Sequence, residues 1–345
     1  MKVTKQHITQ LTKCYCLSEL ERDGRKDYLV ASEKDFACLL LDENGKVLEK
    51  VWDGPGGVMT IEPLPGGSGA FLSTRRFYSP NDSAQASIIL AEPGPEGWKT
   101  RRLCSLPFVH RFGLLEREGR RYMIAATLKS AHGYKDDWTC PGRIWVGELP
   151  EDLRVEGDDR ELTLTPLVSG LYRNHGFFKR REDGMDVAYI GAENGVYRVC
   201  PPKPGEGWTA ERVLDTPASD MLLADLDGDG EAELLVFSPF HGDRITIYRR
   251  GPEGYAPAAF FERPLPFLHA LATCRVGDRE VAVVGYRKAE RELLLCDYDQ
   301  GRYRWQVLDR DVGPANVLCR ERDGKLWVLA ANRETDEVAS YTVEL

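Results

Sequence analysis

A short apolar strand preceded by a polar, Asp- and Gly-rich turn recurs seven times along this 345-residue chain. The copies read DYLVAS, GAFLS, YMIAAT, DVAYIG, ELLVFS, VAVVG and LWVLAA, and they end at Ser32, Ser73, Thr127, Gly191, Ser238, Gly285 and Ala331. Successive copies are therefore 41, 54, 64, 47, 47 and 46 residues apart, and the two longest intervals contain insertions. Self-similarity at this spacing is typical of repeat architectures built from one supersecondary unit.

A second marker recurs later in the unit, as EPGPEGW, PPKPGEGW, RRGPEGY and DYDQGRY, where Pro and Gly predict a tight hairpin before an aromatic residue. Four antiparallel strands repeated seven times predict an all-β, seven-bladed propeller formed by residues 1–345 as a single domain. The last unit lacks a fourth strand, which the N-terminal stretch KVTKQHITQL is expected to supply. The alternative is a β-sandwich or a solenoid of stacked sheets, but ring closure by the two termini favours the propeller.

Charge and hydropathy exclude several classes of partner. The net charge of -9, with acidic and basic residues mixed throughout, provides no basic stripe for nucleic acid. No apolar run is long enough to span a membrane, and the first residues lack a signal-peptide core, so we expect a cytoplasmic protein, or a secreted one if a signal has been removed. Seven of the nine cysteines lie in strand-like apolar runs, which argues against a disulfide framework. The sequence does not indicate an oligomeric state.

The segment from residue 225 to residue 233 carries carboxylates at alternate positions, with glycines where the chain must turn. Hard oxygen ligands at this spacing suit calcium, and the ligands would be Asp225, Asp227, Asp229 and Glu233. An apolar strand follows in place of a helix, which excludes an EF-hand. The pattern resembles the FG-GAP type of propeller repeat, which implies a structural calcium ion between the first two strands of a blade. The alternative is a solvated acidic turn without an ion.

Five of the six histidines map to one face of such a propeller, because loops between second and third strands open on the same face as connections between blades. They are His110, His175 and His269 in connections between blades, and His132 and His241 in second-to-third-strand loops. His7 falls on the closing strand. These five could each be an ordinary structural loop residue, but their convergence predicts a functional site at the mouth of the central channel.

Residues that bind anions and sugars accompany these histidines. Arginine forks match carboxylates, and aromatic rings stack on sugar rings. The predicted substrate-binding residues are Arg75, Arg76, Tyr134, Asn174, His241, Arg244 and Arg287. Zinc is a further cofactor to consider, with mixed nitrogen and sulfur ligands drawn from His132, Cys140, His175 and His241, although their spacing matches no standard zinc pattern.

The motifs FVHRFG, SAHGY and YRNHGF resemble those of propeller lyases that act on uronic-acid polysaccharides, the ulvan lyase type, and the architecture is similar to that of propeller sugar dehydratases. This resemblance implies a carbohydrate lyase whose partner is an acidic carbohydrate or a small sugar. It implies catalytic roles for residues on the central face, namely His110, His132, Tyr172, Arg111, Arg173 and His175.

In such a reaction Arg111 or Arg173 would neutralise the uronate carboxylate, and His110 or His132 would take the neighbouring proton. Tyr172 would then protonate the leaving oxygen. The alternative from another class is a non-catalytic propeller that binds a glycan or a protein on the same face.

Overall fold

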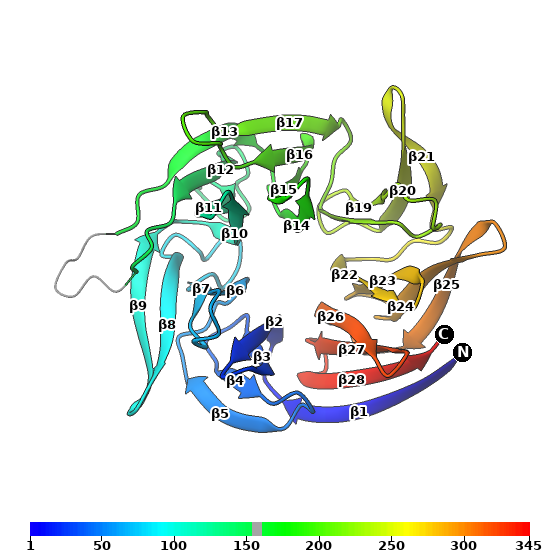
Figure 1. Ribbon diagram of the computed structural model, residues 1–345, viewed down its shortest axis with the longest axis horizontal. Helices are drawn as coiled ribbons and strands as arrows, with labels where there is room; N and C mark the ends of the chain where they lie inside the picture. Colours follow the sequence, from blue (N-terminus) through cyan, green and yellow to red (C-terminus); the bar gives the residue numbers. More distant parts are fainter. Residues whose placement is uncertain (154–160) are drawn as a thin grey trace.

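The protein is a seven-bladed β-propeller, described by a computed structural model over residues 1–153 and 161–345. The described residues form 28 strands in seven four-stranded antiparallel sheets, arranged as a ring around a central axis (Figure 1). The innermost strands of the seven blades are β2, β6, β10, β14, β18, β22 and β26. None of the described residues belongs to a helix long and apolar enough to cross a membrane.

The first three blades lie within residues 14 to 153 and 161 to 171. Blade 1 contains β2 (Cys14–Arg22), β3 (Arg25–Ser32), β4 (Cys38–Leu41) and β5 (Val47–Trp52). Blade 2 contains β6 (Ile61–Pro63), β7 (Phe71–Arg75), β8 (Ser87–Gly94) and β9 (Gly97–Ser105). Blade 3 contains β10 (Val109–Arg117), β11 (Arg120–Lys129), β12 (Pro141–Glu148) and β13 (Thr165–Leu171).

The next three blades follow the same order from the axis outward. Blade 4 contains β14 (Gly176–Glu182), β15 (Met185–Ala192), β16 (Gly195–Cys200) and β17 (Thr209–Leu214). Blade 5 contains β18 (Asp220–Ala224), β19 (Glu233–Ser238), β20 (Arg244–Gly251) and β21 (Gly254–Phe260). Blade 6 contains β22 (Leu268–Val276), β23 (Arg279–Tyr286), β24 (Leu293–Asp299) and β25 (Arg302–Asp309).

Blade 7 closes the ring, as predicted. It joins β26 (Pro314–Arg322), β27 (Lys325–Asn332) and β28 (Glu337–Glu344) to the N-terminal strand β1 (Lys2–Gln10), which pairs antiparallel with β28. The Nζ atom of Lys5 on β1 lies 3.0 Å from Asp309 and 2.8 Å from Glu337, which adds ion pairs to this seam. The two ends of the chain lie side by side at the rim (Figure 1).

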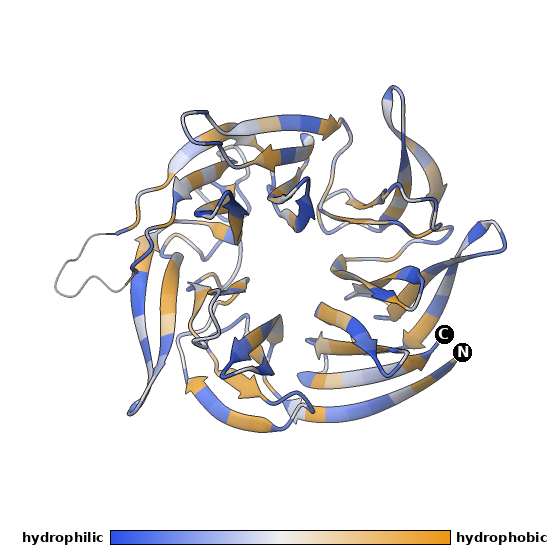
Figure 2. Ribbon diagram, in the orientation of Figure 1, coloured by the Kyte–Doolittle hydropathy of each residue, from blue (hydrophilic) through white to orange (hydrophobic). Residues whose placement is uncertain are grey.

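The seven apolar repeats are the second strands of the seven blades, and they form the core. In β11, for example, the eight residues from Tyr122 to Lys129 are all buried, whereas no residue of the outer strand β21 is. Buried hydrophobic clusters join each blade to its neighbours, such as the one in which Tyr28 of blade 1 packs against Trp327 of blade 7. Hydrophobic and hydrophilic residues alternate along many of the strands (Figure 2), because neighbouring side chains of a strand point to opposite faces of a sheet.

Candidate active site

A β-bulge near the start of several innermost strands turns one side chain toward the axis. The register shifts between Val109 and Arg111 in blade 3, so that His110 is the extra residue, and the same irregularity makes His269 the extra residue of β22. Bulges re-aim side chains and are common beside functional sites. The two histidines therefore lie just inside the innermost strands, and not in the preceding connections as the sequence predicted.

Four of the five predicted histidines meet at one end of the channel. The ring centroid of His175 lies 4.3 Å from that of His110, 5.0 Å from that of His241 and 5.7 Å from that of His269. His110, His175 and His269 are buried, and His241 is partly exposed. We call these four residues the histidine cluster.

Backbone carbonyls of the next blade orient two of these imidazoles. Nδ1 of His175 lies 2.9 Å from the oxygen of Ser219, and Nδ1 of His269 lies 2.7 Å from the oxygen of Ala315. A carbonyl only accepts, so each Nδ1 carries the proton and each Nε2 presents a lone pair. In His269 this lone pair accepts a hydrogen bond from the Tyr15 hydroxyl at 3.0 Å. Nε2 of His175 is buried and has no hydrogen-bond partner among the described residues.

Burial keeps the histidine cluster neutral. Loss of solvent, reinforced by the neighbouring imidazoles and cations, lowers the pKa of His110, His175 and His269 well below its usual value. Burial, with Arg287, Arg111 and Lys288 nearby, lowers the pKa of His241 to about 3. At neutral pH these imidazoles therefore offer lone pairs for hydrogen bonds or metal coordination.

Next to the cluster, residues of all seven innermost strands line a cavity of about 170 Å³ along the channel. Its polar residues include Arg111, Asp220 and His269. Nη1 of Arg111 donates to the oxygen of Met59 at 2.7 Å. Burial raises the pKa of Asp220 to about 6, although Arg111 and backbone N–H groups oppose this effect. A carboxyl group that titrates near neutrality can donate or accept a proton.

Aromatic rings and cations cover the cluster on its outer side. His241 is stacked between Phe240, at a centroid distance of 4.0 Å, and Phe267, at 4.3 Å. The guanidinium carbon of Arg173 lies 5.9 Å from the centre of the Phe240 ring, and that of Arg287 lies 4.9 Å from the centre of the Phe267 ring. Aromatic rings and arginine side chains thus surround the outer side of the cluster, as they do in many ligand pockets.

Other predicted residues of this face are engaged elsewhere or exposed. The ring of His132 packs edge-on against Phe108, with centroids 5.5 Å apart. Cys140 is a partly buried free cysteine, whereas Tyr134 and Tyr172 are 66% and 42% exposed. Arg244 begins β20 and is exposed.

Three more predicted residues have defined protein partners. Arg173 forms an ion pair with Glu193, and Arg287 lies 2.8 Å from Glu334. The buried amide of Asn174 donates to the oxygen of Arg143 at 3.0 Å. Their charges and donors are therefore partly satisfied within the protein.

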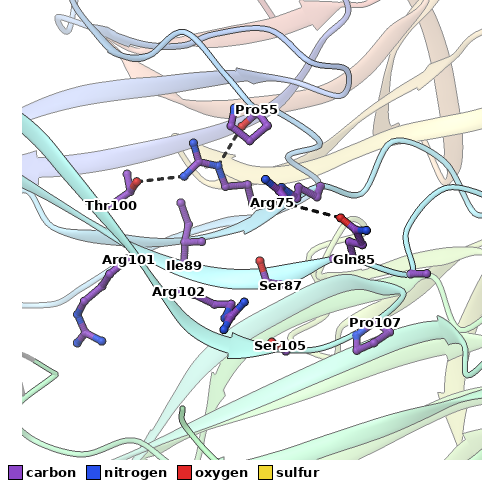
Figure 3. A pocket seen from close by; sticks show the side chains of 13 residues that line it. Pro55, Arg75, Gln85, Ser87, Ile89, Thr100, Arg101, Arg102, Ser105 and Pro107 are labelled. Carbon is purple, nitrogen blue, oxygen red and sulfur yellow. Dashed lines mark hydrogen bonds between the residues drawn. The ribbon is translucent and has the colours of Figure 1, made fainter. Parts of the chain in front are cut away.

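Arg75 and Arg76 lie in a separate cavity of about 540 Å³ in blade 2, also lined by Arg101 and Arg102 (Figure 3). The guanidinium of Arg75 donates to the oxygen of Pro55 and to the hydroxyl of Thr100 (Figure 3). It also donates to the oxygen of Gly54. Neither arginine lines the cavity that contains Arg111.

The predicted calcium turn connects β18 and β19, the first two strands of blade 5, as expected. Asp225, Asp227 and Asp229 place carboxylate oxygens within 4.8 Å of one another. However, Asp227 pairs with Arg249, and the buried carboxylate of Glu233 accepts hydrogen bonds from Leu226 N at 2.8 Å and from the Tyr303 hydroxyl at 2.8 Å. The calcium site thus stays a prediction, and Glu233 is engaged by protein donors.

Three contributors to the central site were missed from the sequence. Tyr15, Ser219 and Asp220 lie at or just before the start of innermost strands, at places equivalent to those of the histidines. An alignment of the seven repeats on their second strands would have shown these residues, because each lies near the start of the first strand, one hairpin earlier in the sequence. His269 was expected on this face but was not in the predicted zinc set.

The propeller resembles solved structures of low sequence identity. The β-propeller domain of Cps50 (Swd1) from Myceliophteria thermophila superposes with a TM-score of 0.64 at 13% identity, over 99% of this chain and 100% of that one. Virginiamycin B lyase from Staphylococcus aureus gives a TM-score of 0.56 at 15% identity, over 99% of both chains. No family model and no curated protein matches the sequence. At these identities the similarity shows the fold alone.

Proposed function

We propose that this protein is a carbon–oxygen lyase that eliminates water or an alcohol from a small carboxylate-bearing sugar in the central cavity. The observation that carries the proposal is the meeting of Arg111, Asp220 and His269 in one cavity beside a buried histidine cluster. Virginiamycin B lyase has a similar propeller fold, which supports the proposal because it is an example of a lyase built on this fold. The reaction class agrees with the resemblance found in the sequence motifs.

The size of the cavity and the guanidinium of Arg111 within it favour a small anionic substrate. Ligand pockets usually measure roughly 300–1,000 Å³, so a cavity of about 170 Å³ suits a single sugar unit better than a polysaccharide chain. Arg111 supplies a guanidinium with donors left over after its bond to Met59. It would pair with the substrate carboxylate and so acidify the neighbouring C–H bond.

Asp220 and the Tyr15–His269 pair would move the protons. As a carboxylate, Asp220 would take the proton from the carbon next to the substrate carboxylate. Electrons of that C–H bond would form the C=C bond, the C–O bond would break, and the leaving oxygen would take the proton of the Tyr15 hydroxyl, which Nε2 of His269 orients. After the product leaves, the proton on Asp220 would return to the Tyr15 phenolate, which restores both groups. Burial raises the pKa of Tyr15, so its hydroxyl stays protonated and can act as this donor.

The experiment is a panel of uronates, aldonates and short acidic oligosaccharides, followed by the ultraviolet absorbance of an unsaturated product. We expect Arg111→Gln and Asp220→Asn to lower kcat/KM by about 10²–10³-fold, the usual effect of losing one preorganised electrostatic group. Arg212→Gln is the matched control, because Arg212 lies on the outer strand β17 and pairs with Asp215. Absence of product from every substrate, with zinc and calcium supplied, would refute the proposal.

The second candidate is a propeller that binds an anionic glycan or protein without turnover. The aromatic and cationic cover of the cluster, which includes Phe240, Phe267 and Arg173, favours it. Calorimetry with the same panel separates the two: saturable binding without product, weakened by Arg173→Gln, would support the binding function.

A further inference from the structure

We propose that His175, His241 and His269 form a binding site for one Zn²⁺ ion, with the fourth coordination position left for water or an anionic ligand. The site does not depend on the reaction proposed above, because it follows from the three side chains alone. Two of the proposed ligands, His175 and His241, belong to the zinc set predicted from the sequence. The third, His269, replaces His132 and Cys140 of that set.

The separation of the ligand atoms fits this proposal. One atom from each of the three residues lies within 4.8 Å of the others. Zinc–nitrogen bonds measure about 2.0–2.1 Å, which places the nitrogens of a tetrahedral site about 3.3 Å apart. A small inward movement of the rings therefore completes the site. His241 lies in the connection between β19 and β20, where such a movement disturbs no strand pairing.

The hydrogen bonds of His175 and His269 prepare their Nε2 atoms for a metal. In both rings Nδ1 donates to a backbone carbonyl, of Ser219 in one case and of Ala315 in the other. Metal-binding histidines almost always donate their other ring nitrogen in this way, which fixes the tautomer and the orientation of the ring.

Unsatisfied nitrogens within the cluster point to an occupant. Nε2 of His175 and Nε2 of His241 are both buried without a hydrogen-bond partner among the described residues. Buried polar atoms in native proteins are nearly always satisfied by protein, water or an ion. Nδ1 of His110 in the same cluster also lacks a partner within the described part of the chain, and a cation shared by His175 and His241 would satisfy two of these three ring nitrogens.

Two neighbours define how the ion would sit. The Tyr15 hydroxyl now donates to Nε2 of His269 at 3.0 Å, so zinc would take that lone pair and release the hydroxyl. Arg111 is close enough to depress the pKa of all three ligands, and its positive charge would favour hydroxide or a carboxylate as the fourth ligand. Three neutral imidazoles with one open position form a typical zinc set.

The test uses the full chain without a polyhistidine tag, stripped with a chelator and titrated with zinc against a chromophoric competitor. Wild type should bind one equivalent of zinc. The variant His241→Phe keeps the stack between Phe240 and Phe267 but removes the nitrogen. It should weaken zinc binding by more than the roughly 10–100-fold that the loss of an outer-shell partner costs. His132→Phe is the matched control and should bind zinc as wild type does.

X-ray absorption of the zinc-loaded wild type gives an answer that needs no variant. We expect a shell of nitrogen or oxygen at about 2.0–2.1 Å, whereas a sulfur shell at about 2.3 Å would show a cysteine ligand and overturn the proposed set. Failure of wild type to compete for zinc, or unchanged affinity in a folded His241→Phe, would also overturn it. All these readouts are independent of lyase activity, so a zinc site in a protein without turnover would refute only the proposed function.

Discussion

Nδ1 of His175 in blade 4 lies 2.9 Å from the backbone oxygen of Ser219 in blade 5, so one blade fixes the tautomer of an imidazole that another blade supplies. His269 of blade 6 and Ala315 of blade 7 repeat this relationship at 2.7 Å. The cluster is thus assembled from contacts between blades. Its geometry depends on ring closure as much as on the histidines themselves.

The four histidines of the cluster should make the metal-free protein sensitive to acid. Their pKa is lowered in the folded state, so below about pH 6.5 the unfolded chain binds more protons than the folded one, and stability falls as the pH falls. If all four stay neutral, the free energy of unfolding decreases by at most about 5 kcal/mol per pH unit below pH 5.5. Urea unfolding at pH 7.5, 5.5, 5.0 and 4.5 in the presence of EDTA measures this slope.

His241→Phe is the control for that slope. Removing one of the four histidines should reduce it by about 1.4 kcal/mol per pH unit. Arg212→Gln should leave the slope unchanged, because it removes no histidine and lies on the outer strand β17. Equal slopes in wild type and His241→Phe would contradict the prediction.

Asp220 should affect the pH dependence of stability in the direction opposite to that of the histidines, and Asp220→Asn tests this. Burial raises the pKa of Asp220 from 3.8 to about 6, so the folded state holds this proton more tightly, and the group contributes less stability as the pH rises from 4 to 6. Asparagine lacks this titration and can still accept the bond from Met221 N. The free energy of unfolding of the variant, relative to wild type, should therefore increase by up to about 3 kcal/mol between pH 4 and pH 7. A constant difference over that range would show that Asp220 titrates normally.

Gly285→Ala should loosen the contact between blades 6 and 7. A Cβ atom at Gly285 would lie 2.2 Å from Cγ of Pro314 and 3.1 Å from Cβ of Ala270, where neither neighbour can rotate away. Overpacking of this kind costs about 1–3 kcal/mol. Gly207→Ala is the matched control, because nothing lies within 4 Å of a Cβ there. Chemical unfolding of both variants should show a loss for Gly285→Ala alone.

Calcium should act on stability if the turn from Asp225 to Asp229 binds it. Millimolar calcium would then raise the thermal midpoint of wild type, and EDTA would lower it. Asp225→Asn and Asp229→Asn should abolish the response. Arg249→Gln should strengthen it, because the guanidinium competes for Asp227. A midpoint that calcium does not change would favour the solvated turn.

The seven apolar repeats predicted the second strand of every blade, and the missing fourth strand of the last repeat predicted closure by β1. Both are confirmed, because they follow from local hydrophobic patterning and from the count of strands. The sequence likewise indicated which face collects His110, His175, His241 and His269, since strand direction alone decides on which face a loop emerges.

Only the tertiary structure decided which of these side chains meet. The bulges at His110 and His269 change the direction of single residues, and no periodicity in the sequence records them. His132 and Cys140 lie in one loop that was predicted to reach the central face, yet His132 packs against Phe108. Asp220 and Tyr15 contribute to the central site from other blades, and no sequence motif marks them. The sequence thus determined the ring and its faces through local patterning. Contacts between strands far apart in the chain, and the burial that shifts their pKa values, determined the chemistry at the centre.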